Sequence, residues 1–503
     1  MKHFWKNYHK WVGLFFTFFI LVFCISGIIL NHRSFFSACD VNRGWLPASY
    51  HYQDWNNGIA KGTLKLSDGE ILLYGNAGVW HTDSCFSVFS SCNDGLKEGS
   101  DNRKISHMVE MPDGGVWCAG LYHLYRMDEA GQWQMHPVDE SSERISDVYS
   151  RGDTLLVLTR SHLFESLPPY TAFVKHQLPA PEGYSPKVSL FRTVWMLHSG
   201  ELFGLFGQLV VDAVALVIIV LCITGLLYTF LPKLIRRRKR RQKPVKSTGV
   251  VLKSSIKWHY RLGAWLIVLT LLLSVTGMCL RPPLMLPLVF TDVHPIPGST
   301  MDSDNPWHDK LRSLRWDDQE HTWLLSTSAG FYRFADFKSA PVPIPQAPPV
   351  SPMGINTFCR DASGRWLVGS FSGMFRWDLA KGEVTDYFTG EPFHKTFGRP
   401  VADHAIAGFS DHLTAAPEVV FDYSAGACTM QGRLSLPEMP QALREQPLSL
   451  WNFALELHVG RCYQPFLGPL SELFVFLAGL TFTLVLLSGY IEHRRRKPKK
   501  RLK

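Results

Sequence analysis

Long apolar runs alternate along the chain with longer stretches of mixed polar and apolar residues. Four of the runs approach the roughly 20 residues that a helix needs to cross a bilayer, at about 11–30, 209–231, 261–280 and 470–491. No small-residue cleavage site follows the first run, and a copy of it lies in mid-chain, so we interpret it as a membrane span and not as a signal peptide. The pattern therefore predicts four transmembrane helices.

The third apolar run repeats the first. The segment HKWVGLFFTFFILVFCISGIIL, which begins at His9, aligns without a gap on HYRLGAWLIVLTLLLSVTGMCL, which begins at His259. A second match precedes the other two runs, where LHSG recurs as LHVG and places His198 on His458. A long internal repeat that keeps its histidines predicts a tandem duplicated helix pair with paired cofactor sites.

The basic residues predict the orientation of the spans. The chain has a net charge of +9, with 46% hydrophobic and 19% charged residues. Basic clusters follow the second and fourth runs, at 233–246 and 493–503. The positive-inside rule then places both termini and the central loop in the cytoplasm, and the two long segments in the periplasm of a Gram-negative cell. Topology accounts for the clusters, so anionic membrane lipid is an expected partner and nucleic acid is not.

Both outer segments contain short β-like runs rich in glycine and aromatic residues. A polar turn, an apolar strand, a small-residue turn and an aromatic strand recur about every 40 residues, as at 112–126 and 361–377, with a degraded copy at 404–436. This rhythm, about three units in each segment, is typical of β-propeller blades. Either the two segments close into one propeller-like domain, or each forms a separate β-rich half-domain.

The expected fold class is a membrane α plus β protein with four transmembrane helices and two β-rich periplasmic segments. The expected boundaries are helix 1 at 1–32, a periplasmic segment at 33–193, helix 2 at 194–235, a basic cytoplasmic loop at 236–257, helix 3 at 258–281, a second periplasmic segment at 282–455, helix 4 at 456–492 and a basic cytoplasmic tail at 493–503.

The four repeated histidines fall at two depths. His9 and His259 open their helices at the cytoplasmic face, and His198 and His458 open the helices that run inward from the outer face. A pseudo-twofold axis along the membrane normal would set the members of each pair opposite each other. Each pair could then supply both axial ligands of one haem b, and a bis-histidine iron favours electron transfer. One interface histidine alone is more often an anchor, but the duplication favours the ligand interpretation.

Three further polar residues near the spans are candidates for the same sites. His32 lies at the outer end of the first span and has no histidine counterpart in the repeat. It is an alternative outer ligand, a contact of a haem propionate or an interface residue. Asp212 and Glu472 each follow a repeated histidine by 14 residues. They either handle protons, bind quinol or contact haem, or they form hydrogen bonds between helices.

The ten cysteines add little. Cys24, Cys222 and Cys279 lie in apolar runs and are expected to be packing residues. Cys85 and Cys92 could form a disulfide in an oxidising compartment. No CxxC or CxxCH sequence occurs, which argues against covalent haem attachment and against a thioredoxin-like site.

Several motifs resemble those of the PepSY-associated transmembrane helix proteins: HKWVGL, SGIILNHR, LHSGELFG, TGLLYTF, WHYRLG, VTGMCL, LHVG and SGYIEH. That family includes iron-regulated inner-membrane proteins and reductases of periplasmic ferric siderophores. The resemblance covers the spans and implies a haem b protein that passes electrons outward, with the four repeated histidines at the positions of the family's helix histidines. Two features depart from it. The outer segments look like propeller blades and not like the α/β PepSY module, and LHVGRCYQPFLG lacks the usual glycine-rich continuation.

Two functions are expected. The first is a bacterial inner-membrane oxidoreductase with two haem b groups, which takes electrons from quinol or a cytoplasmic reductant and reduces a periplasmic ferric siderophore or another ferric chelate. The second is a non-catalytic sensor or partner-binding protein, whose outer propeller is anchored by the spans. No nicotinamide or flavin fingerprint identifies an electron donor.

Overall fold

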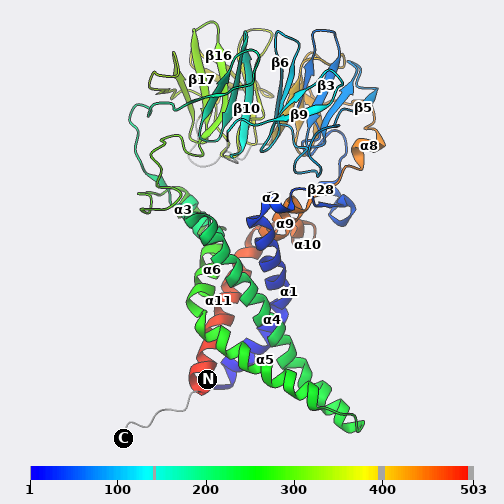
Figure 1. The fold of residues 1–503 in the computed structure, drawn as a ribbon, viewed down its shortest axis with the longest axis vertical. Coiled ribbons are helices and arrows are strands. Elements are labelled where there is room, and N and C mark those ends of the chain that lie inside the picture. Colours follow the sequence, from blue (N-terminus) through cyan, green and yellow to red (C-terminus); the bar gives the residue numbers. More distant parts are fainter. Residues whose placement is uncertain (1, 140–142, 395–402, 497–503) are drawn as a thin grey trace. The chain divides into compact units, whose positions relative to one another are not determined.

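The computed structural model describes residues 2–139, 143–394 and 403–496. The chain divides into two compact units, one helical and one built of β-sheets (Figure 1). The helical unit comprises Met1–Phe36, Pro186–Asp302 and Leu450–Lys503, and the β unit comprises Ser37–Ser185 and Ser303–Ser449. The end of the expected basic tail, residues 497–503, lies outside the described part of the chain.

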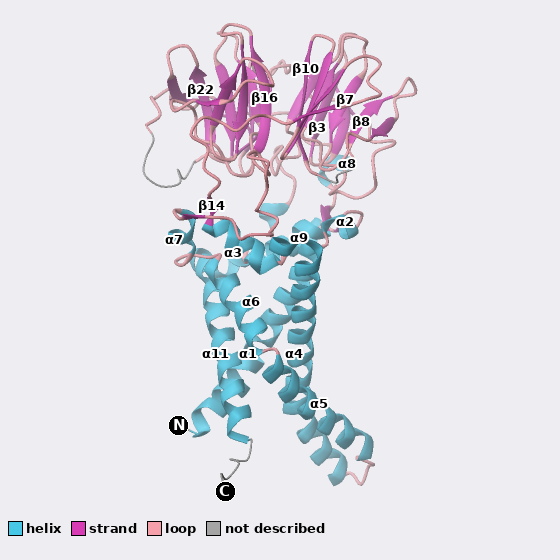
Figure 2. Cartoon of the chain, turned by 60° about the vertical axis from the view of Figure 1, so that its left-hand side comes forward, coloured by secondary structure: helices cyan, strands magenta, loops and turns pink. Residues whose placement is uncertain are grey.

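Three helices in the described part of the chain are long and apolar enough to cross a membrane, and a bent helix pair makes a fourth candidate span. A helix satisfies its own backbone groups, which is why apolar runs of this length form helices in a bilayer. The spans are α1 (Lys2–Asn31), α4 (Gly204–Arg240), α11 (Ser471–Arg496) and the pair α5 (Lys246–Trp265) and α6 (Ile267–Cys279), bent by 68° (Figure 2).

The second and fourth spans begin later than the sequence suggests. The two histidines expected to open them lie on separate short helices, α3 (Leu190–Ser199) and α9 (Leu450–Val459). Each short helix is followed by the glycine of its repeated motif, Gly200 with φ of 86° and Gly460 with φ of 82°. This left-handed conformation ends a helix and suits glycine. The prediction that these histidines open the spans is therefore wrong, because each occupies the last turn of the preceding helix.

The remaining short elements of the helical and β units connect the longer ones. They are α2 (Arg33–Phe36), α7 (Met285–Val289), α8 (Gln441–Arg444) and α10 (Gln464–Leu467), and the two-stranded pairs β1 (Asp40–Val41) with β28 (Leu448–Ser449) and β14 (Val188–Ser189) with β15 (Asp292–Val293).

The β unit consists, in its described residues, of six successive four-stranded antiparallel groups, three from each outer segment. The first three are β2 (Gly62–Lys65), β3 (Ile71–Gly75), β4 (Gly78–Thr82) and β5 (Phe89–Ser91); β6 (His107–Glu110), β7 (Val116–Ala119), β8 (Leu124–Met127) and β9 (Trp133–His136); and β10 (Ile145–Arg151), β11 (Thr154–Thr159), β12 (Leu163–Ser166) and β13 (Val174–His176). The others are β16 (Leu311–Asp317), β17 (Thr322–Thr327), β18 (Phe331–Phe334) and β19 (Val342–Pro343); β20 (Thr357–Arg360), β21 (Trp366–Ser370), β22 (Gly373–Asp378) and β23 (Glu383–Asp386); and β24 (Ile406–Ser410), β25 (Val419–Asp422), β26 (Gly426–Thr429) and β27 (Gly432–Arg433).

Buried side chains connect each group of strands to the next. Leu158 of the third group packs in one cluster with Trp323 of the fourth, which joins the two outer segments. The last group returns to the first: Trp55 and Phe421 share a cluster, and β2 pairs with β24 in parallel through Gly62 and Phe409. The two outer segments therefore form one β unit, and the alternative of two separate half-domains is wrong.

The suggested disulfide between Cys85 and Cys92 does not form. Both cysteines are free thiols, and Cys85 is exposed to solvent. Cys92 is buried in the apolar cluster between the first two groups of strands. Of the cysteines in apolar runs, Cys24 and Cys222 pack together in one cluster of the helical unit, as expected of packing residues.

A buried histidine is expected to make the stability of the β unit depend on pH. His107 begins β6, with its Nδ1 3.3 Å from Oδ1 of Asp147. Burial lowers the pKa of His107 to about 4, which outweighs the attraction of Asp147. Between pH 6.5 and 4 the unfolded chain therefore binds a proton that the folded chain does not. As the pH is lowered through this window, the free energy of unfolding decreases by up to about 3 kcal/mol.

We expect His107→Gln to flatten this dependence, because glutamine binds no proton. The measurement is denaturant unfolding of the β unit in the purified full chain at several pH values between 4 and 7. Parallel curves for the wild type and the variant would contradict the prediction.

Candidate functional site

Each of the four repeated histidines packs on a serine–glycine or threonine–glycine pair of another helix. The contacts are His9 on Ser488–Gly489, His259 on Thr224–Gly225, His198 on Thr276–Gly277 and His458 on Ser26–Gly27. At all four glycines, the atom nearest to the place of a Cβ is Cε1 of the histidine ring. The glycines thus leave room for an imidazole to lie against the helix backbone.

The Nδ1 atom of every repeated histidine has a hydrogen-bond partner. Nδ1 of His9 lies 2.9 Å from the carbonyl oxygen of Val485, and those of His259 and His458 lie 3.1 Å from the carbonyl oxygens of Leu221 and Phe23. Nδ1 of the fourth lies 3.1 Å from the hydroxyl oxygen of Thr276. A carbonyl oxygen only accepts, so Nδ1 of the first three carries the proton and donates it, which leaves the lone pair on Nε2. The hydroxyl of Thr276 donates to the carbonyl oxygen of Leu272, so it accepts from Nδ1 of His198 in the same way.

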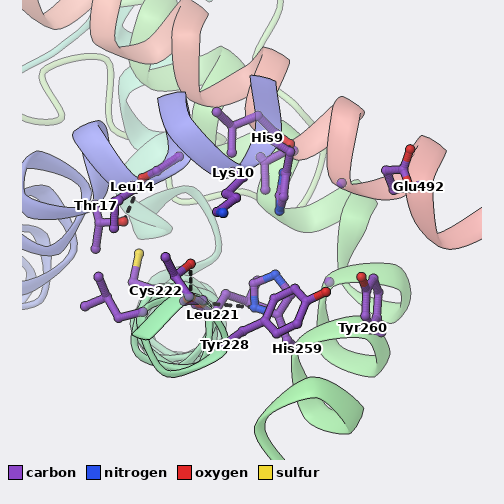
Figure 3. A pocket seen from close by; sticks show the side chains of 18 of the residues that line it. His9, Lys10, Leu14, Thr17, Leu221, Cys222, Tyr228, His259, Tyr260 and Glu492 are labelled. Carbon is purple, nitrogen blue, oxygen red and sulfur yellow. Dashed lines mark hydrogen bonds between the residues drawn. The ribbon is translucent and has the colours of Figure 1, made fainter. Parts of the chain in front are cut away.

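The structure brings the four histidines together as two facing pairs. The ring centres of His9 and His259 are 6.0 Å apart, and those of His198 and His458 are 6.2 Å apart. Figure 3 shows His9 and His259 pointing toward one another across a pocket. In the part of the chain that the structure describes, no hydrogen bond engages any of the four Nε2 atoms. These pairs are the ones that the pseudo-twofold repeat leads us to expect.

This geometry fits a haem iron. A first-row metal binds an imidazole nitrogen at about 2 Å, so a metal between two facing rings needs ring centres about 6 Å apart. Among the described residues, no group of three or more histidine, cysteine or acidic side chains could hold a metal ion. Two protein ligands suit a metal that receives its other ligands from a macrocycle, as haem iron does.

A pocket of about 390 Å³ lies between the first pair of histidines and is lined by α1, α4, α5 and α11. Its apolar wall includes Leu14, Ile20, Ile218, Leu226, Phe482 and Val485. Its polar lining includes the basic residues Lys6, Lys10, Lys233 and Arg236 and the acidic residue Glu492. An apolar slot whose polar lining is mainly basic suits a porphyrin, whose ring is apolar and whose two propionates are anionic.

The two pairs lie at different depths in the helical unit. α1 contributes to both, since His9 belongs to the first pair and Gly27 contacts His458 of the second. A helix rises 1.5 Å per residue, so these two positions are about 27 Å apart along α1. That distance is close to the roughly 30 Å of a bilayer's hydrocarbon core.

His32 and Asp212 bind each other. Nε2 of His32 lies 2.6 Å from Oδ2 of Asp212, and Asn31 donates to Oδ1 of the same carboxylate at 3.1 Å. His32 is thus engaged by a carboxylate and lies in neither histidine pair. The contact joins α1 to α4, so it is the helix–helix hydrogen bond considered for Asp212. Glu472, its counterpart in the repeat, is exposed in the first turn of α11.

Two of the four hydroxyl–glycine pairs on which the histidines pack were not expected from the sequence. The repeat aligns Ser26–Gly27 with Thr276–Gly277 but assigns no role to Thr224–Gly225 or Ser488–Gly489. A signal was present, because a hydroxyl residue followed by glycine occurs once in each of the four apolar runs at 11–30, 209–231, 261–280 and 470–491. What the sequence could not show is which histidine docks on which pair.

The chain matches the model of a known protein family. The model described as the PepSY-associated TM region matches residues 1–233 and 130–496. The chain belongs to this family. The resemblance seen in the spans is therefore confirmed, and with it the assignment as a membrane protein. No protein of curated function matches the chain significantly.

Several solved structures show a distant likeness to this PepSY-associated protein. One is the extracellular domain of a putative hybrid two-component system from B. thetaiotaomicron, with 10% identity and a TM-score of 0.35 over 74% of this chain and 32% of that one. A second is virginiamycin B lyase from Staphylococcus aureus with Quinupristin, with 8% identity and a TM-score of 0.33 over 80% and 87%. A third is PorZ of Porphyromonas gingivalis, with 10% identity and a TM-score of 0.32 over 78% and 39%. The chain thus spans about a third of the first structure.

Proposed function

We propose that this PepSY-associated protein passes electrons across the bacterial inner membrane through two haem b groups. His9 and His259 would hold one haem, and His198 and His458 the other. The observation that carries the proposal is the pairing of four imidazoles at 6.0 and 6.2 Å between ring centres, each with Nδ1 hydrogen-bonded. Haem, when bound, supplies a one-electron carrier.

The protein's own groups orient the ligands. The backbone carbonyl oxygens of Val485, Leu221 and Phe23 hold Nδ1–H, which sets the tautomer and makes Nε2 more basic. Paired imidazoles leave no open coordination position for oxygen, which favours electron transfer over oxygen chemistry. The basic lining residues Lys10 and Arg236 are placed to bind propionates.

In this proposal both termini and the α4–α5 loop are cytoplasmic, because the basic clusters lie there. The first histidine pair is then the inner site and the second pair the outer site. The β unit is periplasmic and is a six-bladed propeller, whose first and last blades are joined by the pairing of β2 with β24. Electrons would enter from quinol or a cytoplasmic reductant.

The proposed acceptor is a periplasmic ferric siderophore or another ferric chelate. One electron converts Fe(III) to Fe(II), which binds hard oxygen ligands less tightly, so the chelate releases its iron.

The visible spectrum of the full chain, purified in detergent from haem-replete cells, tests the proposal. We expect a reducible bis-histidine b-type spectrum with about two haems per chain. Colourless protein would overturn it and would favour the alternative, a membrane-anchored sensor or partner-binding propeller. That alternative gives no reason for the facing histidines.

A further inference from the structure

Helix α5 does not continue the line of the helix that follows it. α5 and α6 meet at Leu266 and are bent by 68° (Figure 2). α6 has 13 residues and is about 20 Å long, which is too short to cross the roughly 30 Å of a bilayer's hydrocarbon core. The 20 residues of α5, inclined by 68°, add about 11 Å along the direction of α6. If α6 crosses along the membrane normal, α5 runs obliquely through one leaflet and ends at its headgroups.

Two stripes of side chains face outward along α5. Val251, Trp258 and Trp265 recur every seven residues, so they lie along one line of the helix, and they are 46%, 43% and 69% exposed. Beside this apolar stripe lies a basic stripe of exposed side chains, formed by Lys246, Lys253, Lys257 and Arg261. A line of tryptophans next to a line of lysines is typical of a helix that lies in a membrane interface.

The opposite face of α5 packs on α4. Ser255 is buried, and the hydroxyl oxygen of Thr248 accepts a hydrogen bond from Nη1 of Arg238 at 3.0 Å. The same helix carries His259, whose Nδ1 lies 3.1 Å from the carbonyl oxygen of Leu221. The two outward stripes therefore point away from α4 and are available to another partner.

The basic stripe has no acidic counterpart nearby in the chain. No aspartate or glutamate occurs between Asp212 and Asp292. Within residues 2–139, 143–394 and 403–496, Lys253 and Lys257 form no ion pair. Anionic headgroups complement such a stripe. The exposed tryptophans beside it favour a bilayer over an acidic soluble protein, because tryptophan prefers the membrane–water interface.

We propose that α5 binds anionic phospholipid of the inner leaflet and that this contact holds His259 against α4. The lysine ammonium groups reach the lipid phosphates, while the apolar stripe enters the hydrocarbon beside them. The break at Leu266 means that α6 does not hold α5 in line, so the lipid contact supplies part of the support for His259. The link to haem rests on the proposed function, whereas the lipid contact does not.

Native mass spectrometry of the detergent-purified full chain, titrated with phosphatidylglycerol or phosphatidylcholine, tests the contact. We expect the wild type to bind phosphatidylglycerol preferentially. Lys253→Gln/Lys257→Gln should weaken that binding about tenfold or more, because each lysine near an anionic lipid surface strengthens the attraction. Lys253→Arg/Lys257→Arg should keep it, since the charge is retained. The matched control, Lys65→Gln/Lys338→Gln, removes two exposed lysines of the β unit and should have no effect.

Polyglutamate is the probe for the alternative partner, an acidic soluble protein. Tight binding of polyglutamate, together with no preference of the wild type for phosphatidylglycerol, would overturn the proposal. Equal phosphatidylglycerol binding by the wild type and Lys253→Gln/Lys257→Gln would overturn it as well. Trp258→Gln should also weaken lipid binding, because the indole no longer enters the interface, and unchanged binding by this variant would contradict the interfacial position of α5.

Haem loss from nanodiscs tests the effect on His259. The rate of loss to an excess of a haem-free haem-binding protein should be several-fold lower in phosphatidylglycerol than in phosphatidylcholine. This difference should disappear in Lys253→Gln/Lys257→Gln. Equal rates in the two lipids would refute the support of His259 by lipid. Colourless protein would overturn the proposed function instead, and the lipid titration, which needs no haem, would still decide whether α5 binds lipid.

Discussion

Replacing His198 with alanine is expected to remove about one of the two haems from each chain. The ring centre of His198 is 6.2 Å from that of His458, so the substitution leaves this pair with a single imidazole. The inner pair at His9 and His259 is separate and should keep its haem. The measurement is the haem content per chain by the pyridine haemochrome method, with the low-spin signal by electron paramagnetic resonance. His259→Ala should give the same loss from the inner site.

The matched control for this experiment is His32→Ala. His32 directly follows α1 in the same helical unit, but its Nε2 is 2.6 Å from Asp212 and it belongs to neither pair. We expect this variant to keep both haems. Loss of a haem from His32→Ala would make His32 a ligand, and full haem content in both His198→Ala and His259→Ala would refute the ligand assignment.

Gly277→Ala should weaken haem binding by His198 and His458 about tenfold or more, because the added methyl group would press on the ring of His198. A methyl group at Gly277 would lie 2.7 Å from Cε1 of His198 and 3.3 Å from its Nδ1. The ring must therefore move away from the hydroxyl of Thr276, which it meets at 3.1 Å. Changes in groups that orient a metal ligand typically cost 10–100-fold in affinity. The rate of haem loss to an excess of a haem-free haem-binding protein measures the effect.

Gly27→Ala provides the matched control in the same site. The corresponding methyl group would lie 3.4 Å from Cε1 of His458, which is close to an ordinary contact. The inner site offers the same comparison, with Gly489 at 2.7 Å from His9 and Gly225 at 3.5 Å from His259. Equal haem retention by both members of each comparison would show that the glycines do not position the rings.

The spans and the histidine pairs could be anticipated because both are written in local sequence. A run such as 11–30 has the length and apolar composition of a membrane helix, and the gapless repeat aligns His9 with His259. Duplicated helices that pack around a pseudo-twofold axis bring equivalent residues face to face. The same argument failed for His198 and His458 in one detail, because Gly200 and Gly460 end their helices before the spans begin.

In the β unit, the recurrence of blade-like segments indicated the strands but not how the two outer segments combine. The apolar strand of each unit is buried on both faces, as in β11 and β17, and such a strand needs neighbours on either side. Leu158 of β11 and Trp323 of β17 are far apart in the chain, and they pack against each other as such neighbours. The proposed disulfide failed for the same reason, since Cys92 packs inward with the core while Cys85 faces solvent.

The sequence by itself determined the spans, the duplication and the four histidines, because hydrophobic length and residue identity are local properties. Only the tertiary structure decided which groups meet: each imidazole with a hydroxyl residue and glycine of another helix, and His32 with Asp212. These contacts join residues that are mostly distant in the chain, and they depend on how helices and strands pack side by side. A single sequence can show which residue types recur, as with the hydroxyl–glycine pairs, but not which of them pack together.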